Sequence, residues 1–423
     1  MTTTSKWAGV TLAAMIAAGL WVSRRSEIEH VSGPVLPPGK VVPQIAMTWD
    51  AATLLAPDGT LWAWGGVQFG LEGSFSSHTV TPVPLRVGRD SDWARVGISW
   101  NHTVALKQDG SLWGWGYNPE GALTTTPSNR VANPQRIGTG NDWADVSSGA
   151  SHVMALKRDG SLWTWGQNRY GQIGDGTTNN YFVPFQVTTN REWKSIAAGF
   201  FNSYAIAGDG TIWGWGLCGS GVGRGPDDHV PVRLDPGSNW VAISSADYQM
   251  VAVRGDGSLW IHGQNASVTV PTGPTARTTR LFQIGSATNW VAGWAGQRGV
   301  MARKQDGSWW VSGAGPAVAY LGEGPVSGDG SGMRRMADGF DPLALGVGFG
   351  TAAILTRDGV LWSAGQRLGE PGRMTLLNRM QGLVALISGS RSNPQPSPVV
   401  DRVLRRIWQL PVPSTNSPTP VIR

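Results

Sequence analysis

The sequence predicts an all-β protein folded as a seven-bladed β-propeller of ~50-residue repeats. An Asp-Gly pair between short apolar runs recurs at intervals of 47 to 52 residues. A Trp follows each Asp after four residues and a Gly follows it after seven, without exception. A repeat of this length without helical periodicity cannot bury both faces of its own sheet, so it must stack on its neighbours. The Asp of this pair stands at seven positions: Asp58, Asp109, Asp159, Asp209, Asp256, Asp306 and Asp358.

Each repeat should supply three or four short strands. The first strand opens with a Trp sixteen residues before the Asp in five copies: Trp93, Trp143, Trp193, Trp240 and Trp290. The second and third strands flank the Asp-Gly pair, for which we expect a type I′ turn, because Asp and Gly tolerate positive φ. The second and third repeats are the most regular. Their structural positions are Asp109, Gly110, Trp113, Gly116, Asp159, Gly160, Trp163 and Gly166.

The third repeat is similar to a known family. Its run from Ser147 to Gly174, with His152, Asp159-Gly160 and Trp163-Thr-Trp-Gly166, resembles the repeat of the regulator of chromosome condensation family. The resemblance covers roughly residues 41–390. It implies a seven-bladed propeller whose faces hold another protein, as in exchange factors for a small GTPase, ubiquitin-ligase and channel-associated propellers, and secreted inhibitors of β-lactamases. The family's His, seven residues before the Asp, remains only at His102 and His152.

The sequence outside the repeats predicts three further segments. Residues 1–30 contain an uncharged, mostly apolar run from Trp7 to Val22 and are expected to be a signal peptide or membrane anchor. A linker (31–41), the propeller (42–390) and a Pro/Arg-rich, disordered tail (391–423) follow. Blade one could be closed by residues 42–47 or by residues 383–389. Because of the apolar run at the N-terminus, we expect a periplasmic, secreted or membrane-anchored protein. The alternative is a cytoplasmic protein.

The distribution of charge argues against nucleic-acid binding by the propeller. The chain has a net charge of +6, but residues 1–40 carry +2 and residues 391–423 carry +4. The repeats are therefore neutral and lack an electrostatic reason to bind phosphates. The expected partner is another protein or peptide, residues 7–22 could contact a membrane, and the chain is expected to be a monomer.

The sequence shows no pattern that indicates catalysis. The six His residues lack metal-ligand spacing, and neither a nucleophile elbow nor a phosphate-binding loop is present. We expect no cofactor, no metal and no enzymatic activity. His102 and His152 are interpreted as structural turn residues. The Asp carboxylates recur in all seven copies, and their role in the turn explains them. Function is therefore expected where the copies differ.

The copies differ usefully in the turn between the first and second strands, nine and eight residues before each Asp. Six of these fourteen positions carry large aromatic side chains, although turns favour Gly, Asn, Asp and Ser. Equivalent turns should form a ring on one face, and aromatic side chains with Arg are typical binding anchors. Alternatively, the rings pack into the channel mouth or under loops. The predicted binding residues are Trp49, Trp100, Phe200, Phe201, Tyr248, Arg298 and Phe349.

These observations favour a non-catalytic protein-binding propeller that acts as a scaffold or inhibitor. The alternatives are a glycan lyase or hydrolase on a propeller, a carbohydrate-binding module, and a purely structural role in a surface assembly. If the ring binds a partner, most of its aromatic side chains should be accessible to solvent.

Overall fold

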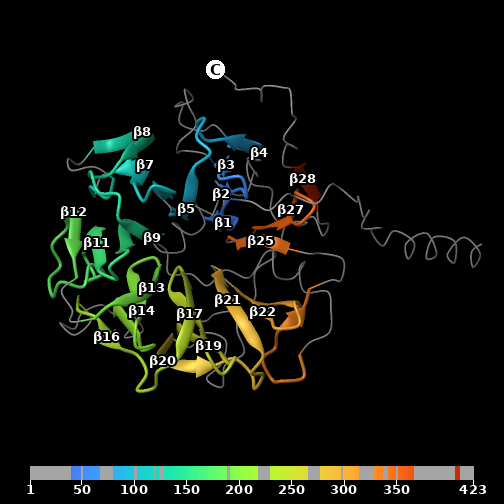
Figure 1. The fold of residues 1–423 in the computed structure, drawn as a ribbon. Coiled ribbons are helices and arrows are strands. Elements are labelled where there is room, and N and C mark those ends of the chain that lie inside the picture. Colours follow the sequence, from blue (N-terminus) through green and yellow to red (C-terminus); the bar gives the residue numbers. More distant parts are fainter. Residues whose placement is uncertain are drawn as a thin grey trace, which may run out of the picture. The chain divides into compact units, whose positions relative to one another are not determined.

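The computed structural model describes most of the repeat region and one short segment beyond it. The described residues are 40–48, 51–66, 80–99, 102–118, 120–123, 128–187, 191–217, 229–264, 277–296, 299–313, 327–336, 342–348, 351–365 and 405–409. They form seven sheets of four antiparallel strands, in which consecutive strands are neighbours. The predicted seven-bladed propeller is therefore confirmed, with one blade for each Asp-Gly pair (Figure 1).

The strands of each blade follow one another along the chain. Blades one to three consist of β1 (Gln44–Met47), β2 (Ala51–Leu55), β3 (Leu61–Gly66), β4 (Val80–Arg86), β5 (Trp93–Ile98), β6 (His102–Lys107), β7 (Leu112–Asn118), β8 (Ser128–Arg136), β9 (Trp143–Ser148), β10 (His152–Lys157), β11 (Leu162–Gly166) and β12 (Tyr181–Gln186). Blades four and five consist of β13 (Trp193–Ala198), β14 (Asn202–Ala207), β15 (Ile212–Gly216), β16 (Val232–Arg233), β17 (Trp240–Ala246), β18 (Gln249–Arg254), β19 (Leu259–Gln264) and β20 (Arg277–Gln283). Blades six and seven consist of β21 (Trp290–Gly296), β22 (Gly299–Lys304), β23 (Trp309–Gly313), β24 (Arg334–Arg335), β25 (Pro342–Val347), β26 (Thr351–Thr356), β27 (Val360–Gly365) and β28 (Arg405–Gln409).

The first strand of each blade lines the centre of the propeller. Each of these strands contacts the first strand of the next blade, and β25 of blade seven contacts β1 of blade one, which closes the ring. Residues 44–47 thus supply the first strand of blade one, where they pair with β2. The alternative strand, residues 383–389, lies outside the described residues.

The Asp-Gly turn differs from the expected type I′. In blade two the N–H of Gly110 donates to the carbonyl of Lys107 (2.9 Å), and the N–H of Lys107 donates to the carbonyl of Ser111 (3.0 Å). Gly110 has φ of 82°, whereas Asp109 is not among the residues with positive φ. The expectation of two left-handed residues was therefore wrong. The loop has three residues and places only its Gly in the left-handed region.

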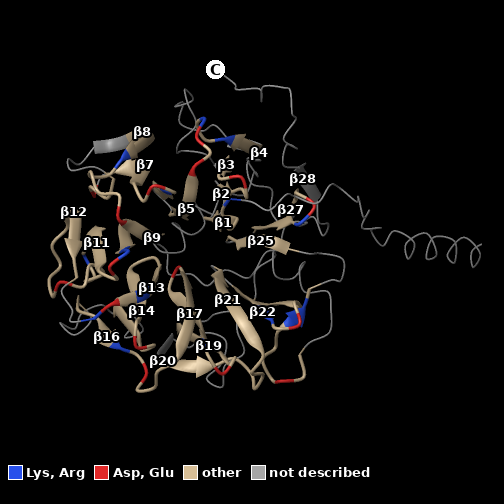
Figure 2. Cartoon of the chain, in the orientation of Figure 1, with Lys and Arg blue, Asp and Glu red and all other residues tan. Residues whose placement is uncertain are grey.

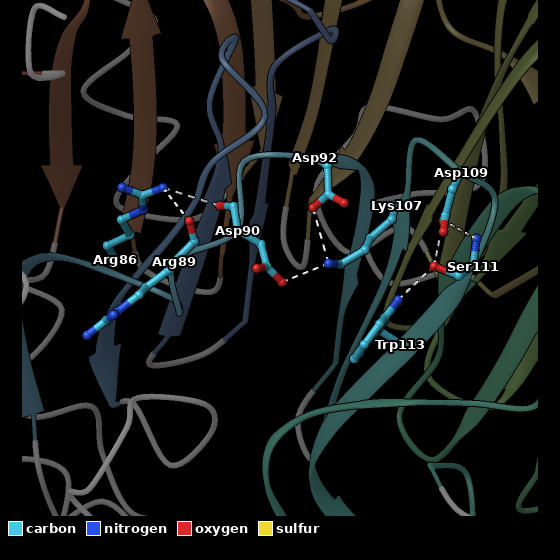
Figure 3. A network of polar contacts seen from close by, with 8 residues as sticks. All are labelled: Arg86, Arg89, Asp90, Asp92, Lys107, Asp109, Ser111 and Trp113. Carbon is cyan, nitrogen blue, oxygen red and sulfur yellow. Dashed lines mark hydrogen bonds and ion pairs between the residues drawn. The ribbon is translucent and has the colours of Figure 1, made fainter.

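A side-chain relay explains why Asp and Trp stand four residues apart. The Oδ1 atom of Asp109 accepts hydrogen bonds from the N–H (2.8 Å) and the hydroxyl (2.6 Å) of Ser111. The hydroxyl oxygen of Ser111 in turn accepts the indole N–H of Trp113 at 2.8 Å (Figure 3). These hydrogen bonds from Ser111 lower the pKa of Asp109. The relay uses the same Ser or Thr position in six blades: Thr60, Ser111, Ser161, Thr211, Ser258 and Ser308.

The same turn also joins one blade to the next. The carbonyl of Gly110 accepts the N–H of Trp143, the residue that opens blade three, at 3.3 Å. Glycines of other turns make the equivalent bond, for example Gly160 with Trp193 at 2.8 Å. The Asp-Gly turn therefore connects neighbouring blades as well as the second and third strands of its own blade.

Tryptophans fill the interior of the regular blades. Trp93 is buried and packs edge-on against Trp113 (6.1 Å between centroids) and at a tilt against Trp115 (5.9 Å). Blades three and four repeat this triplet. Burial of such large apolar surfaces is the main stabilising contribution to the core.

The ends of the chain fall largely outside the described residues. The predicted signal or anchor segment (1–30) is not described, nor is the tail apart from β28. Within that tail, Arg405–Gln409 pair with β27 as the fourth strand of blade seven, so the expectation of disorder does not hold there. The short Arg-Arg-Ile-Trp run supplies an edge that β27 would otherwise leave open. In the described part of the chain, no helix is long and apolar enough to cross a bilayer.

Candidate functional site

The described residues include three of the seven predicted binding residues. Phe200 and Phe201 lie in the turn between β13 and β14, and Tyr248 lies in the turn between β17 and β18. All three side chains are half-buried. The other four, Trp49, Trp100, Arg298 and Phe349, lie outside the described residues. The complete aromatic ring therefore stays a prediction, and the described site is its part on blades three to five.

Hydrogen bonds between backbones link the turns of these three blades, which we call the inner turns. The N–H of Ala150 in blade three donates to the carbonyl of Phe200 in blade four (3.1 Å). The N–H of Phe200 donates to the carbonyl of Asp247 in blade five (2.5 Å). Asp247 adopts φ of 50°, a conformation that a non-Gly residue seldom takes. The equivalent turns thus lie side by side as the repeat register predicts, and their backbones hold one another in place.

The aromatic side chains on these turns form one cluster. Phe200 packs edge-on against Phe201 (4.4 Å between centroids) and at a tilt against Tyr248 (5.4 Å). Tyr170, from the loop between β11 and β12 of blade three, packs on Phe201 at 4.7 Å. We refer to Tyr170, Phe200, Phe201 and Tyr248 as the aromatic cluster. Three successive blades contribute to it, and all four rings stay partly accessible.

The loop that carries Tyr170 is fixed by its own polar residues. The N–H of Tyr170 donates to Oε1 of Gln172 (2.9 Å), and the carbonyl of Gln172 accepts the indole N–H of Trp215 (2.9 Å). The Oδ1 atom of Asn168 accepts a hydrogen bond from the N–H of Ile173 (2.9 Å), and its Nδ2 donates to Oδ1 of Asp175 (3.1 Å). Such a loop keeps the tyrosine in position before any partner arrives, which reduces the entropic cost of binding.

Tyr170 was not predicted from the sequence. The prediction compared only the inner turns, whereas Tyr170 belongs to the loop between the third and fourth strands. In an antiparallel four-stranded blade these two connections lie at the same end of the strands. The run Gly166-Gln-Asn-Arg-Tyr-Gly171, complete only in blade three, was therefore the available signal.

Charged residues in the described part of the chain are interspersed around the propeller rather than gathered in one basic patch (Figure 2). Several basic residues are engaged in the repeat itself. The Nζ atom of Lys107 lies 2.8 Å from Asp90 and 3.2 Å from Asp92 (Figure 3) and 4.8 Å from the ring centroid of Trp113. Burial lowers the pKa of Lys107, but the hydrogen bonds to Asp90 and Asp92 outweigh it and raise the pKa overall. These contacts give Lys107 a structural role in its blade.

The two family-type histidines are buried contacts between blades. Nε2 of His102 lies 2.9 Å from the hydroxyl of Ser148 in blade three, and Nε2 of His152 lies 3.0 Å from the hydroxyl of Ser203 in blade four. Both residues begin a second strand rather than occupy the turn before it. Burial lowers the pKa of His102 to about 4, and burial together with the charge of His102 lowers that of His152 to about 3. Among the described residues, no three His, Cys, Asp or Glu side chains come together to hold a metal.

These lowered pKa values predict that acid destabilises the propeller before its carboxylates titrate. His102 and His152 stay neutral in the folded state below pH 6.5, whereas the unfolded chain takes up protons there. The associated stability is fully present above pH 6.5 and is lost as the pH falls towards 4. The slope is at most about 1.4 kcal/mol per pH unit for each histidine.

The measurement is the free energy of unfolding between pH 7.5 and pH 5. We expect the variant His102→Gln/His152→Gln to show a much flatter dependence than the unmodified chain, since Gln249 already occupies the equivalent position in blade five. Parallel pH profiles for the two proteins would contradict the assignment of neutral, buried histidines.

Comparison with known proteins agrees with the repeat geometry. A family model described as "Regulator of chromosome condensation (RCC1) repeat" matches residues 109–156 and 159–206. A second model of the same description matches residues 93–122 and 143–172. Residues 93–206 therefore carry RCC1 repeats.

Two curated relatives match short stretches of this chain. The Ultraviolet-B receptor UVR8 of Arabidopsis thaliana is 30% identical over 83 residues, which are 19% of this chain and 19% of the receptor. The X-linked retinitis pigmentosa GTPase regulator homolog of Caenorhabditis elegans is 30% identical over 84 residues, 20% of this chain and 6% of its own. The chain thus matches a fifth or less of the length of these relatives.

Solved structures match most of the chain. Human WBSCR16 has a TM-score of 0.62 at 18% identity, covering 74% of this chain and 86% of its own. Prp20p of Saccharomyces cerevisiae has a TM-score of 0.62 at 17% identity. The match covers 80% of this chain and 85% of Prp20p. At these identities the likeness establishes the fold alone.

Proposed function

We propose that this RCC1-repeat propeller is a non-catalytic binding protein that holds another protein or peptide on the face formed by its inner turns. The observation that carries the proposal is the aromatic cluster, in which half-buried rings from three blades meet at a preformed surface. Aromatic side chains in such positions are the usual anchors of protein interfaces.

The proposal fits what is known of similar propellers. The yeast propeller Prp20p has been studied for its binding to Gsp1p and histones, and yeast RCC1 (Prp20) has been crystallised with Kap60 bound to it. These partners belong to the yeast protein. For this chain they support only the general idea that an RCC1-repeat propeller binds proteins.

The test is to remove two anchors and measure binding. The propeller is used to capture partners from an extract of the cells that make it, and the affinity for the purified partner is then measured. We expect Phe200→Ala/Tyr248→Ala to weaken binding at least tenfold, because truncating central aromatic anchors costs about 2 kcal/mol or more and about 1.4 kcal/mol corresponds to tenfold.

A matched control removes two aromatic side chains outside the cluster. Tyr117 is 44% exposed on β7 and Phe182 is 40% exposed on β12, so Tyr117→Ala/Phe182→Ala deletes comparable surface elsewhere. Circular dichroism of both variants checks that the propeller is intact. Equal affinity of the cluster variant and the control for the partner would refute the proposed binding face.

We also propose that the protein is exported or anchored to a membrane by its N-terminus. The support is the uncharged run from Trp7 to Val22, preceded by Lys6. Cell fractionation combined with mass determination of the N-terminus tests this. Recovery of the protein in the cytoplasm with residues 1–22 intact would contradict it.

A further inference from the structure

We propose that the aromatic cluster recognises an acidic, aromatic-containing peptide segment of the partner, with Arg169 binding a carboxylate next to the anchored ring. This inference rests on the proposed function and specifies the chemistry of the partner. It depends on the position, exposure and pairing of Arg169 at the edge of the cluster.

Arg169 is exposed and lies over the ring of Tyr170, with 5.7 Å between the guanidinium carbon and the ring centroid. Within the described part of the chain, no carboxylate lies within ion-pair distance of Arg169. Arg254, by comparison, lies 2.9 Å from Asp235. Among the described residues, the guanidinium of Arg169 thus has no carboxylate partner beside this apolar surface.

The backbone on both sides of Arg169 is held in place. The N–H of Gln167 donates to the carbonyl of Ser151 in the inner turn (2.8 Å), and the N–H of Asn168 donates to Oδ1 of Asn180 (2.9 Å). The N–H of Gly171 donates to the carbonyl of Asn168 (3.0 Å). A guanidinium on a fixed backbone and within cation–π distance of an aromatic ring loses less freedom when it binds a carboxylate.

The positive charge of Arg169 lies at one end of the cluster. Arg169 and Tyr170 come from blade three, Phe200 and Phe201 from blade four, and Asp247 with Tyr248 from blade five. A ligand whose carboxylate points towards blade three and whose ring lies on the phenylalanines satisfies the guanidinium. Because a charge-assisted, bidentate Arg–carboxylate contact is directional, it would also fix the orientation of the peptide.

The test is selection of a displayed random-peptide library on the immobilised full chain. We expect enriched peptides to carry an aromatic residue with Asp or Glu beside it. On the variant Arg169→Gln the aromatic residue should stay enriched while the acidic preference disappears. The matched control is Arg191→Gln, because Arg191 is also exposed and lies over an aromatic ring, that of Trp213 at 4.0 Å, on the connection that enters blade four.

The affinity of the best peptide is then compared with that of its Asn or Gln analogue. We expect the amide analogue to bind about tenfold more weakly to the unmodified chain and equally well to Arg169→Gln, since only the charged contact differs. The Arg191→Gln variant should keep the full tenfold preference.

The outcomes separate the inference from the proposed function. Enrichment of aromatic peptides without an acidic preference, or a preference that survives Arg169→Gln, would overturn the inference and leave the binding face standing. Enrichment that persists on Phe200→Ala/Tyr248→Ala would overturn both. Selection of basic peptides, or binding of oligosaccharides in place of any peptide, would also overturn the inference.

Discussion

The substitution Gly110→Ala should destabilise the propeller by about 2–5 kcal/mol. Gly110 has φ of 82°, and a Cβ atom there would lie 2.2 Å from the carbonyl oxygen of Asn141. An L-residue in the left-handed region costs about 1–2 kcal/mol, and displacing packed atoms to make room adds about 1–3 kcal/mol. The displaced segment leads into blade three, where the N–H of Trp143 donates to the carbonyl of Gly110. The substitution would therefore strain this contact between blades two and three.

Gly138→Ala is the matched control for this prediction. Gly138 has φ of 70°, but nothing lies within 4 Å of the position that its Cβ would take. This variant should therefore show only the backbone cost of about 1–2 kcal/mol. Chemical denaturation of both variants measures the difference. Equal losses of stability would mean that the close approach of Asn141 does not contribute.

The sequence predicted the fold because its signal lies in local, repeated chemistry. The Asp-Gly pairs and the Trp and Gly positions that follow them define the hairpin, the core and the number of blades without any long-range information. The type of turn was missed because Asp-Gly is compatible with two loop lengths, and only the backbone φ of Asp109 distinguishes them. The role of Ser111 in the relay was missed because Ser and Thr share it, so no single residue type repeats.

The site was predicted only in part, for a reason of geometry. Counting back from each Asp places Phe200, Phe201 and Tyr248 on equivalent turns, and the structure brings them into contact. Tyr170 and Arg169 stand in a connection of variable length, where residue counting fails. The same limit applies to β28, because 39 residues separate it from β27, the strand with which it pairs in blade seven. Pairing of that kind is decided by the whole sheet and not by a local pattern.

The substitution Trp215→Ala should cost about 3–5 kcal/mol, as expected for deleting a fully buried Trp. Trp215 is 0% exposed and packs against Trp193 in the core of blade four. Trp213, two residues earlier on β15, is only half-buried and serves as the control. Trp213→Ala should cost about 1–2 kcal/mol, because much less packing is lost.

Trp215 also supports the binding loop, so its loss should affect binding as well as stability. Its indole N–H donates to the carbonyl of Gln172, and Gln172 in turn receives the N–H of Tyr170. The variant Trp215→Phe keeps most of the buried ring and removes the donor. We expect it to stay folded at low temperature yet bind the selected peptide more weakly, whereas Trp213→Ala binds normally. Unchanged peptide affinity in Trp215→Phe would show that the loop holds Tyr170 in place without the blade-four core.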